Sequence, residues 1–382
     1  MKITLKNTPE QVELIKAMAS RNRSVAFEAQ TALAEFIGPV LAEVINQAPA
    51  LSNLFTTLQY NADDNPSIPL DLYHDISDED YVQVFSQSRA GGLPTSEVLP
   101  TSSELKIATY SLDSAVSFDR RYAAKSRMDV VAKTMTRVAQ EILIKQNTIS
   151  ANVIMKAVAN ATTNSVAHIE ESSAVKRFVL ADLNRMITRS KRIVSSFIGG
   201  TPDARSGKGI TDIICSPEIV EELRAIAYNP INTKGSPAEA SKVVRTADFI
   251  AQEAFSAAGA PEFYGINVIE LNEMGGSGLG GSSRQFNNIF VNEQSGNVAL
   301  AGGAAGDQAA AADDELVLGI DRSRESLVRP VAVDADNGGE FNLIADDQYS
   351  IRQNKIGYFG SLEEGRIVLD NRALIGTLVM GA

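Results

Sequence analysis

The sequence predicts an α+β fold built around one exceptionally long helix. Three observations carry this expectation: helical periodicity over residues 129–160, β-type runs through the last third of the chain, and a proline-rich extended stretch over residues 60–118. The 382 residues are 44% hydrophobic and 21% charged, which is ordinary for a globular protein. The length allows two or three domains with a sizeable core.

Residues 8–48 are expected to be helical. Thr8, Pro9 and Gln11 form a capping-box start, in which Thr8 accepts a hydrogen bond from a first-turn amide and Pro9 occupies the first helical position. Apolar residues then recur at helical spacing. Gly38-Pro39 is expected to break this helix into two pieces, because proline lacks the amide hydrogen that an interior helical residue donates.

Residues 60–118 carry four prolines and the pair Gly91-Gly92 between two strand-like runs. Tyr81–Phe85 leads in and Leu105–Phe118 leads out, so we expect a two-stranded arm with its tip near residues 90–94. An isolated pair of strands is marginally stable in water, and the arm is therefore expected to rest on another surface. The alternative is an ordinary hairpin within a sheet of the same domain.

Residues 129–160 give the clearest helix. Lys133, Arg137, Glu141 and Lys145 step by four along one face, and a further helix is expected at 180–197. The predicted apolar stripe of the long helix is Val131, Met135, Val138, Ile142, Ile149 and Val153.

Strands and helices are expected to alternate over the following hundred residues. Ile210–Cys215 has a buried-strand pattern, and Ser216-Pro217-Glu218 opens a helix with serine as its N-cap. The other expected elements are a helix from Ser236 to Phe255, a strand at Tyr264–Leu271, a glycine-rich loop at 275–281, a strand near Asn288–Val291 and a flexible loop at 301–314.

The last third of the chain is expected to be rich in strands, with Gly360 and Gly365 marking turns. The predicted strands are Leu316–Ile320, Leu327–Val333, Tyr349–Phe359, Arg366–Leu369 and Leu374–Met380.

Charge is divided unevenly along the chain, whose formal net charge is −12. Residues 61–100 hold eight acids and one base, whereas residues 120–192 hold fourteen bases and five acids. Opposite patches steer association and fix register, so we expect contacts between copies. The residues expected to meet are Asp75, Asp78, Glu79 and Asp80 of one copy and Lys133, Arg137 and Lys145 of another. The alternative is two independently solvated faces.

No catalytic, metal-binding or cofactor-binding residues are expected. Cys215 closes an apolar strand and is expected to be structural, while His74 lies in the acidic arm and His168 in a polar link. Residues 276–281 have the spacing G-x-G-x-x-G. A dinucleotide site needs a helix directly after such a loop, and the sequence there predicts a polar loop and a strand instead.

Several other classes of protein are disfavoured by composition. No apolar run approaches the roughly 20 residues of a membrane helix, and the first residues lack the apolar core of a signal peptide, so neither a membrane span nor export is expected. A single cysteine excludes an internal disulfide. The negative balance argues against a protein that grips nucleic acid over its whole surface.

The order of these elements resembles the major capsid proteins of tailed bacteriophages, the Hong Kong 97-like capsid fold that encapsulin shells share. The segments that carry the resemblance are Leu105–Phe118 running into Arg120–Met155, then Ile210–Leu223, Glu262–Ile269, Ser350–Gly360 and Gly365–Leu374.

The resemblance implies five parts. They are an N-terminal helical arm (1–59), an extension-loop hairpin (60–118), a peripheral domain with a spine helix (119–205), an axial domain (206–335) and returning strands of the peripheral domain (336–382). Some members cross-link their subunits through a lysine in the extension loop. Here that arm offers only Lys106, well past the expected tip, so cross-linking is not expected.

The resemblance also implies a structural protein without enzymatic activity. Pentamers and hexamers would close into an icosahedral shell around phage double-stranded DNA, without sequence-specific binding and without a membrane. The protein would lie in the virion after assembly in the host cytoplasm, with scaffold, portal and decoration proteins as further partners. Two alternatives stay open: an encapsulin-like compartment that stores cargo enzymes, and a soluble nucleotide-binding enzyme that uses the loop 276–281.

Overall fold

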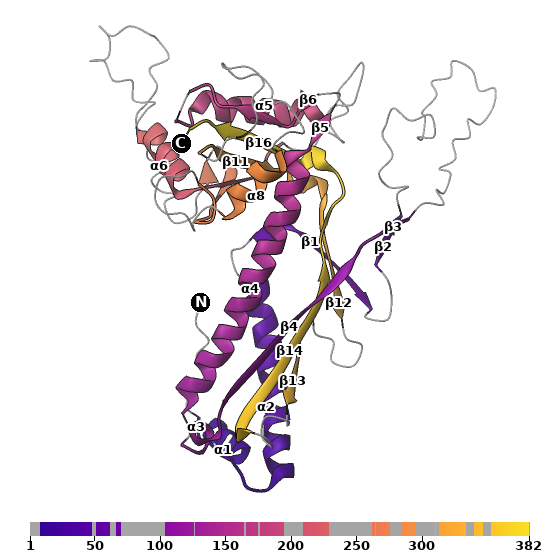
Figure 1. The fold of residues 1–382 in the computed structure, drawn as a ribbon, viewed down its shortest axis with the longest axis vertical. Helices are drawn as coiled ribbons and strands as arrows, with labels where there is room; N and C mark the ends of the chain where they lie inside the picture. Colours follow the sequence, from indigo (N-terminus) through magenta and orange to yellow (C-terminus); the bar gives the residue numbers. More distant parts are fainter. Residues whose placement is uncertain are drawn as a thin grey trace, which may run out of the picture. The chain divides into compact units, whose positions relative to one another are not determined.

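The computed structural model divides the chain into two compact units (Figure 1). Unit 1 comprises residues 1–70, 101–150 and 327–367, and unit 2 comprises residues 71–100, 151–326 and 368–382. The structure describes residues 8–47, 51–61, 66–69, 104–125, 127–163, 166–174, 176–194, 209–228, 262–263, 265–275, 285–294, 310, 313–333, 340–346 and 353–381. The described elements mix helices with sheets, which confirms the α+β class.

Unit 1 contains a six-stranded sheet with the order β1-β12-β14-β13, in which β4 also pairs with β14 and β15 with β12. The strands are β1 (Thr56–Asn61), β4 (Thr109–Asp119), β12 (Leu327–Val333), β13 (Asn342–Asp346), β14 (Lys355–Gly365) and β15 (Ile367–Val368). The longest ladder joins β4 and β14, antiparallel, from Thr109 opposite Gly365 to Asp119 opposite Lys355.

The β4 ladder corrects part of the predicted arm. At the base of the arm, β2 (Ser67–Pro69) pairs with β3 (Glu104–Lys106), which confirms two-stranded pairing there. Beyond Lys106, however, the outgoing strand belongs to the six-stranded sheet, because its alternate side chains, such as Phe118, pack into the core. The expected lead-in strand and the tip near residues 90–94 lie outside the described residues.

The helices of unit 1 begin with a confirmed cap. The Gln11 amide donates to Thr8 Oγ1 at 3.4 Å, and Pro9 is the first helical residue. The helices are α1 (Pro9–Met18), α2 (Arg23–Gln47), α3 (Arg120–Ala124) and the unit 1 portion, up to Ser150, of α4 (Met128–Ala159).

The predicted break at Gly38-Pro39 is wrong. Helix α2 runs through both residues, and the chain leaves the helical conformation earlier, between α1 and α2. Ile37 and Leu41 flank the pair and are both buried, so packing stabilises the helix across the position where proline removes one hydrogen bond.

By length and composition alone, residues 23–45 of α2 could cross a membrane, contrary to the expectation from the sequence. Nearly half of the apolar window is buried inside unit 1, and one side of the helix packs into the core. Core helices of soluble proteins have the same composition, so this helix is explained by packing.

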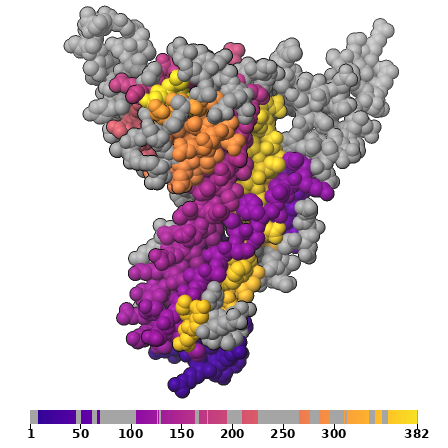
Figure 2. Space-filling model, viewed as in Figure 1, coloured from indigo at the N-terminus to yellow at the C-terminus, as the bar shows by residue number. Residues whose placement is uncertain are grey.

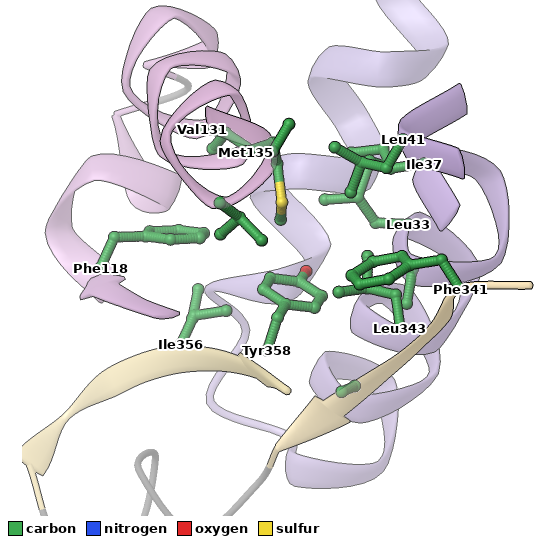
Figure 3. Packing of buried hydrophobic residues seen from close by; sticks show 14 of the residues in the cluster. Leu33, Ile37, Leu41, Phe118, Val131, Met135, Phe341, Leu343, Ile356 and Tyr358 are labelled. Carbon is green, nitrogen blue, oxygen red and sulfur yellow. The ribbon is translucent and has the colours of Figure 1, made fainter. Parts of the chain in front are cut away.

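Helices α2 and α4 pack on the same face of the sheet and form the core of unit 1 (Figure 3). Each large apolar side chain buried there contributes about 1.5–3 kcal/mol to stability. Phe118 and Tyr358 stack within this core, with ring centroids 6.3 Å apart. The labelled core residues are Leu33, Ile37 and Leu41 from α2, Val131 and Met135 from α4, and Phe118, Phe341, Leu343, Ile356 and Tyr358 from the sheet and its approach.

Helix α4 confirms the predicted long helix but shifts the second half of its buried stripe. Ile149 and Val153 are only half-buried, whereas Gln146, Ser150 and Ile154 are fully buried. The buried line therefore continues from Ile142 in steps of four and admits two polar residues. The buried Ser150 hydroxyl has a hydrogen-bond partner within the helix, because it donates to the Gln146 carbonyl at 2.7 Å.

Gly360 and Gly365 do not mark turns, as the sequence had suggested, but lie within β14. A Cβ atom on Gly360 would stand 2.4 Å from Phe341 Cζ, and one on Gly365 would stand 2.9 Å from the Ala108 carbonyl oxygen. Glycine is required at both positions because neighbouring atoms occupy the space of a side chain.

Unit 2 holds a second six-stranded sheet, with the order β7-β16-β11-β8-β10-β9. The strands are β7 (Ile169–Glu171), β8 (Asp212–Cys215), β9 (Glu262–Phe263), β10 (Ile266–Glu270), β11 (Glu315–Ile320) and β16 (Leu374–Val379). Its described helices are α5 (Leu180–Val194), α6 (Pro217–Tyr228) and α8 (Gln285–Gln294). Ser216 caps α6 as predicted, since the Ile219 amide donates to Ser216 Oγ at 3.2 Å. The helix expected from Ser236 to Phe255 lies outside the described residues.

The strand expected near Asn288–Val291 is instead the helix α8. Phe286, Phe290 and Gln294 are buried at a spacing of four, which is a helical face rather than strand alternation. Asn287 fixes the helix to β11: its side chain donates to the Asp314 carbonyl at 2.6 Å and accepts from the Leu316 amide at 3.1 Å.

Candidate assembly surface

The outer face of α4 carries a basic ridge, which we define as Lys133, Arg137, Ile144 and Lys145. All four side chains are exposed, and Ile144 retains 61% of its surface. The ridge points away from the core, because Val131 and Met135 on the opposite side of the helix face the sheet. The magenta surface of α4 stays uncovered on the side drawn in Figure 2.

The structure therefore brings together the three basic residues that the sequence singled out. None of them forms an ion pair with any described residue. The four acids expected to meet them, Asp75, Asp78, Glu79 and Asp80, lie outside the described residues. Pairing between the two groups stays a prediction.

Beneath the ridge, a buried ion network ties α4 to the sheet. The Glu364 carboxylate is fully buried and accepts hydrogen bonds from Arg329 Nε at 2.7 Å and Arg366 Nη2 at 2.9 Å. Tyr110 donates to the same carboxylate at 2.8 Å, and Gln146 of α4 donates at 3.0 Å. Charged groups buried this deeply are tolerated when they are paired and hydrogen-bonded.

Arg366 extends the network to two further segments. Its Nη1 donates to the Gln146 carbonyl at 2.7 Å, its Nη2 donates to Ser52 Oγ at 3.2 Å, and its guanidinium stands 5.5 Å from the centre of the Phe55 ring. Arg366 therefore links the segment just before β1, helix α4 and the end of β14 in one site. The sequence does not predict this network; the polar Gln146 on the buried side of α4 signals that a buried polar partner exists but does not identify it.

The network holds Glu364 ionised. Burial disfavours the charged form, but the guanidinium groups of Arg366 and Arg329 and the Tyr110 hydroxyl outweigh burial, so the pKa of Glu364 is lowered. The pKa of Tyr110 is raised, first by burial and then by the charge of Glu364. Both groups thus keep one protonation state across the neutral range, and the link between α4 and the sheet does not titrate there.

The other face of the sheet is a second exposed surface of unit 1. Ile344 of β13 lies directly opposite Phe359 of β14, which lies opposite Ala115 of β4. Ile344 and Phe359 retain 50% and 37% of their surface, whereas Leu343 and Tyr358, the residues just before them in the sequence, point into the core. Large apolar residues gathered on an exposed sheet face are typical of contact surfaces.

The described residues offer little for catalysis. Cys215 is buried, and burial raises its pKa to about 12, which leaves the thiol unreactive. His168 is also buried, with Nδ1 3.0 Å from the carbonyl oxygens of both Asn371 and Leu374, and burial lowers its pKa. No group of three metal-ligating side chains occurs among the described residues.

Among the described residues of unit 2, Glu315 has a pKa that its surroundings raise toward neutrality. Glu315 at the start of β11 is 2% exposed and accepts a short hydrogen bond from Ser216 Oγ. Burial raises its pKa to about 7, the Ser216 hydroxyl opposes that shift, and the nearby carboxylates Glu218 and Glu222 add to it. This group makes unit 2 sensitive to pH.

Comparisons with known proteins add a likeness in fold. No protein-family model and no curated protein matches the chain. The capsid of the cyanophage P-SCSP1u is similar at 13% identity over 88% of this chain and 89% of that chain, with a TM-score of 0.44. The virus-like particle from Pyrococcus furiosus is similar at 12% identity over 92% and 99%, with a TM-score of 0.43.

A third similar structure is the holo-SrpI encapsulin complex from Synechococcus elongatus, at 11% identity over 87% of each chain, with a TM-score of 0.43. The likeness is one of fold alone, and the function is argued below from the chain's own residues.

Proposed function

We propose that this chain is a structural subunit that assembles with copies of itself into a closed icosahedral shell of pentamers and hexamers around phage double-stranded DNA. The observation that carries the proposal is the basic ridge of α4, which exposes Ile144 among three cations without an ion partner in the described part of its own chain. An apolar centre with a charged rim is the usual anatomy of a binding surface.

The acidic arm is the proposed partner of that ridge. Residues 61–100 hold eight acids and one base, and the two-stranded base of the arm comprises only three residue pairs. Such an arm gains stability by resting on a neighbouring copy, and a contact between different surfaces of identical chains forms a ring when the rotation between copies closes. Repeated contacts of this kind hold a shell together even when each one is weak.

The buried network under the ridge suits a region of the subunit that must resist mechanical force. Arg366 and Glu364 connect α4 with the sheet through hydrogen bonds that are fully excluded from water. A force applied to the outer face of α4 would therefore reach the sheet through these buried hydrogen bonds. Exposed ion pairs, which contribute little to stability, are not needed for this connection. The proposed peripheral domain would be the part of each subunit that holds its neighbours.

The test is assembly of the purified protein, followed by negative-stain microscopy and sedimentation. We expect shells tens of nanometres across for the wild type. Reversing Asp75, Asp78, Glu79 and Asp80 to lysine should abolish shells while the circular dichroism spectrum stays unchanged. The matched control reverses four exposed acids of α1 and α2, Glu10, Glu13, Glu28 and Glu35, and should still assemble.

Two results would contradict the proposal. A wild-type chain that stays monomeric excludes a shell, and normal shells from the arm variant exclude the pairing of arm and ridge. The content of purified particles distinguishes the two kinds of shell. Nuclease-protected double-stranded DNA supports a phage capsid, and an enclosed protein supports an encapsulin-like compartment. The scaffold, portal and decoration partners, and assembly in the host cytoplasm, belong to the phage version.

One observation favours a second candidate, a nucleotide-binding enzyme. Helix α8 begins at Gln285, four residues after the glycine-rich loop 276–281, where the sequence had predicted a strand. A helix after such a loop is one requirement of a dinucleotide site. A rise in melting temperature on addition of NAD, lost on Gly278→Val, would support the enzyme.

A further inference from the structure

The outward face of the unit 1 sheet combines an apolar centre with an acidic border. Its centre is the row Ala115, Phe359 and Ile344, set side by side by the strand register. The charged residues at the other outward-facing positions of β4, β13 and β14 are four acids and one base: Asp113, Asp119, Asp346, Glu363 and Lys355. We call these residues together the acidic sheet face.

The basic ridge of α4 has the opposite character on the opposite side of the same unit. Its apolar centre is Ile144, and its border carries Lys133, Arg137 and Lys145, with Glu141 as the one acid. Val131 and Met135 of α4 and Tyr358 of β14 fill the core between the two surfaces. The ridge and the acidic sheet face of one chain therefore cannot touch each other.

We propose that the acidic sheet face of one copy docks on the basic ridge of the next copy, with Ile144 packed against Ile344 and Phe359. This inference rests on the proposed function and names the second surface through which unit 1 meets its neighbour. Because the two surfaces are different and point in opposite directions, the contact repeats head to tail, and such a repeat forms a ring when the rotation between successive copies closes.

Charge selects the ridge of α4 over helix α2 of unit 1. Helix α2 also exposes a large apolar residue, Phe36, but its exposed charges include the acids Glu28 and Glu35. Docking α2 on the acidic sheet face would bring like charges together, which disfavours the complex. The ridge offers the same apolar chemistry with the complementary charge.

The contact is compatible with an arm that reaches the same neighbour. The arm leads directly into β4, whose outward residue Asp113 belongs to the acidic sheet face. Sheet face and arm are thus consecutive along the chain, and together they present one acidic partner for the row of cations on α4. Separate substitutions in the arm and in β4 distinguish the two contributions.

A cysteine pair tests the geometry. The chain has a single native cysteine, Cys215, which is buried. In the assembled protein, Ile144→Cys combined with Ile344→Cys should give, on mild oxidation, a ladder of covalent oligomers on a denaturing gel. Either cysteine alone gives at most dimers, and Phe36→Cys with Ile344→Cys is the control pair on the wrong helix.

A charge swap tests the chemistry. Asp113→Lys alone and Arg137→Glu alone should each lower the yield of assembled particles roughly tenfold, because each places like charges opposite one another in every contact. The double variant restores opposite charges in every contact and should recover most of the yield. Lys16→Glu on the exposed side of α1 is a matched control and should leave the yield unchanged.

The outcomes separate this inference from the proposed function. Wild-type shells with no ladder from the Ile144 and Ile344 pair, or with no recovery in the double variant, overturn the docking of sheet face on ridge while shell formation stands. Wild-type protein that forms no shells overturns the proposed function itself. A ladder from the Phe36 pair instead assigns the sheet face to α2.

Discussion

The carboxylate of Glu364 and the guanidinium of Arg366, two residues apart on the chain, form a fully buried ion pair with 2.9 Å between Oε1 and Nη2. Arg329 contacts the other carboxylate oxygen at 2.7 Å. Two cations therefore share one anion in the interior of unit 1. Removing the anion would leave both guanidinium groups without their charged partner.

We expect Glu364→Gln to lower the free energy of unfolding of unit 1 by about 3–5 kcal/mol, because breaking a buried pair strands its partner charges. Urea denaturation followed by circular dichroism measures the change. Glu13→Gln on the exposed side of α1 should change the same quantity by less than about 0.5 kcal/mol. An equal effect from both variants would show that the network contributes nothing.

Two glycines of unit 1 should respond to alanine in opposite directions. Gly360→Ala would drive a methyl group into Phe341 and should destabilise the protein by about 1–3 kcal/mol. Gly38→Ala lies inside α2, where the new Cβ would stand 3.8 Å from Leu343 Cβ, and should stabilise by about 0.5–1 kcal/mol. Melting temperatures check the signs, and Phe341→Leu should relieve the Gly360→Ala defect.

The buried Glu315 predicts that unit 2 loses stability as pH rises. Its pKa in the folded chain is about 7, against an ordinary value of 4.5, so its contribution is complete below about pH 4.5 and is lost as pH rises through 7. The loss amounts to up to about 3 kcal/mol. Glu315→Gln removes this titrating group. It should therefore flatten the pH dependence of the melting temperature between about pH 5 and pH 8.

If the melting temperatures of Glu315→Gln and the wild type depend on pH in the same way, the ionisation of Glu315 does not control the pH dependence of the stability of unit 2. Glu222→Gln provides a comparison, since its pKa is also raised, first by burial, but the side chain is only half-buried. Its effect should be the smaller of the two.

Cys215 reports the opening of unit 2. Because the thiol is buried and its pKa is raised to about 12, it should resist a thiol reagent such as dithionitrobenzoate in the native protein. Adding denaturant should release one reactive thiol per chain, over the concentration range in which unit 2 unfolds. Rapid labelling without denaturant would contradict the burial of β8.

Local sequence signals predicted the elements whose stability is local. The capped start of α1 at Thr8, the long helix α4 and the Ser216 cap of α6 each follow from short-range hydrogen bonds or from periodicity over many residues. These features need no knowledge of the rest of the chain.

The missed features all depend on partners far away in sequence. Gly38-Pro39 stays helical because Ile37 and Leu41 are packed, and Gly360 is needed only because Phe341 approaches it. The pairing of Gln146 with Glu364 spans 218 residues, and no local pattern could indicate it. Phe286 and Phe290 did carry a helical signal, which the short apolar run Ile289-Phe290-Val291 obscured because it resembles a strand.

The ladder between β4 and β14 joins residues near 110 to residues near 360. Unit 1 is thus completed by the segment 327–367, which is synthesised after the other two segments of that unit. Until that segment emerges, a nascent chain lacks the sheet against which α4 packs and the Phe359 that a neighbour would meet. Under the proposed assembly, synthesis order therefore delays self-association until the segment 327–367 has been made, which would keep shorter nascent chains on one polysome from polymerising with each other.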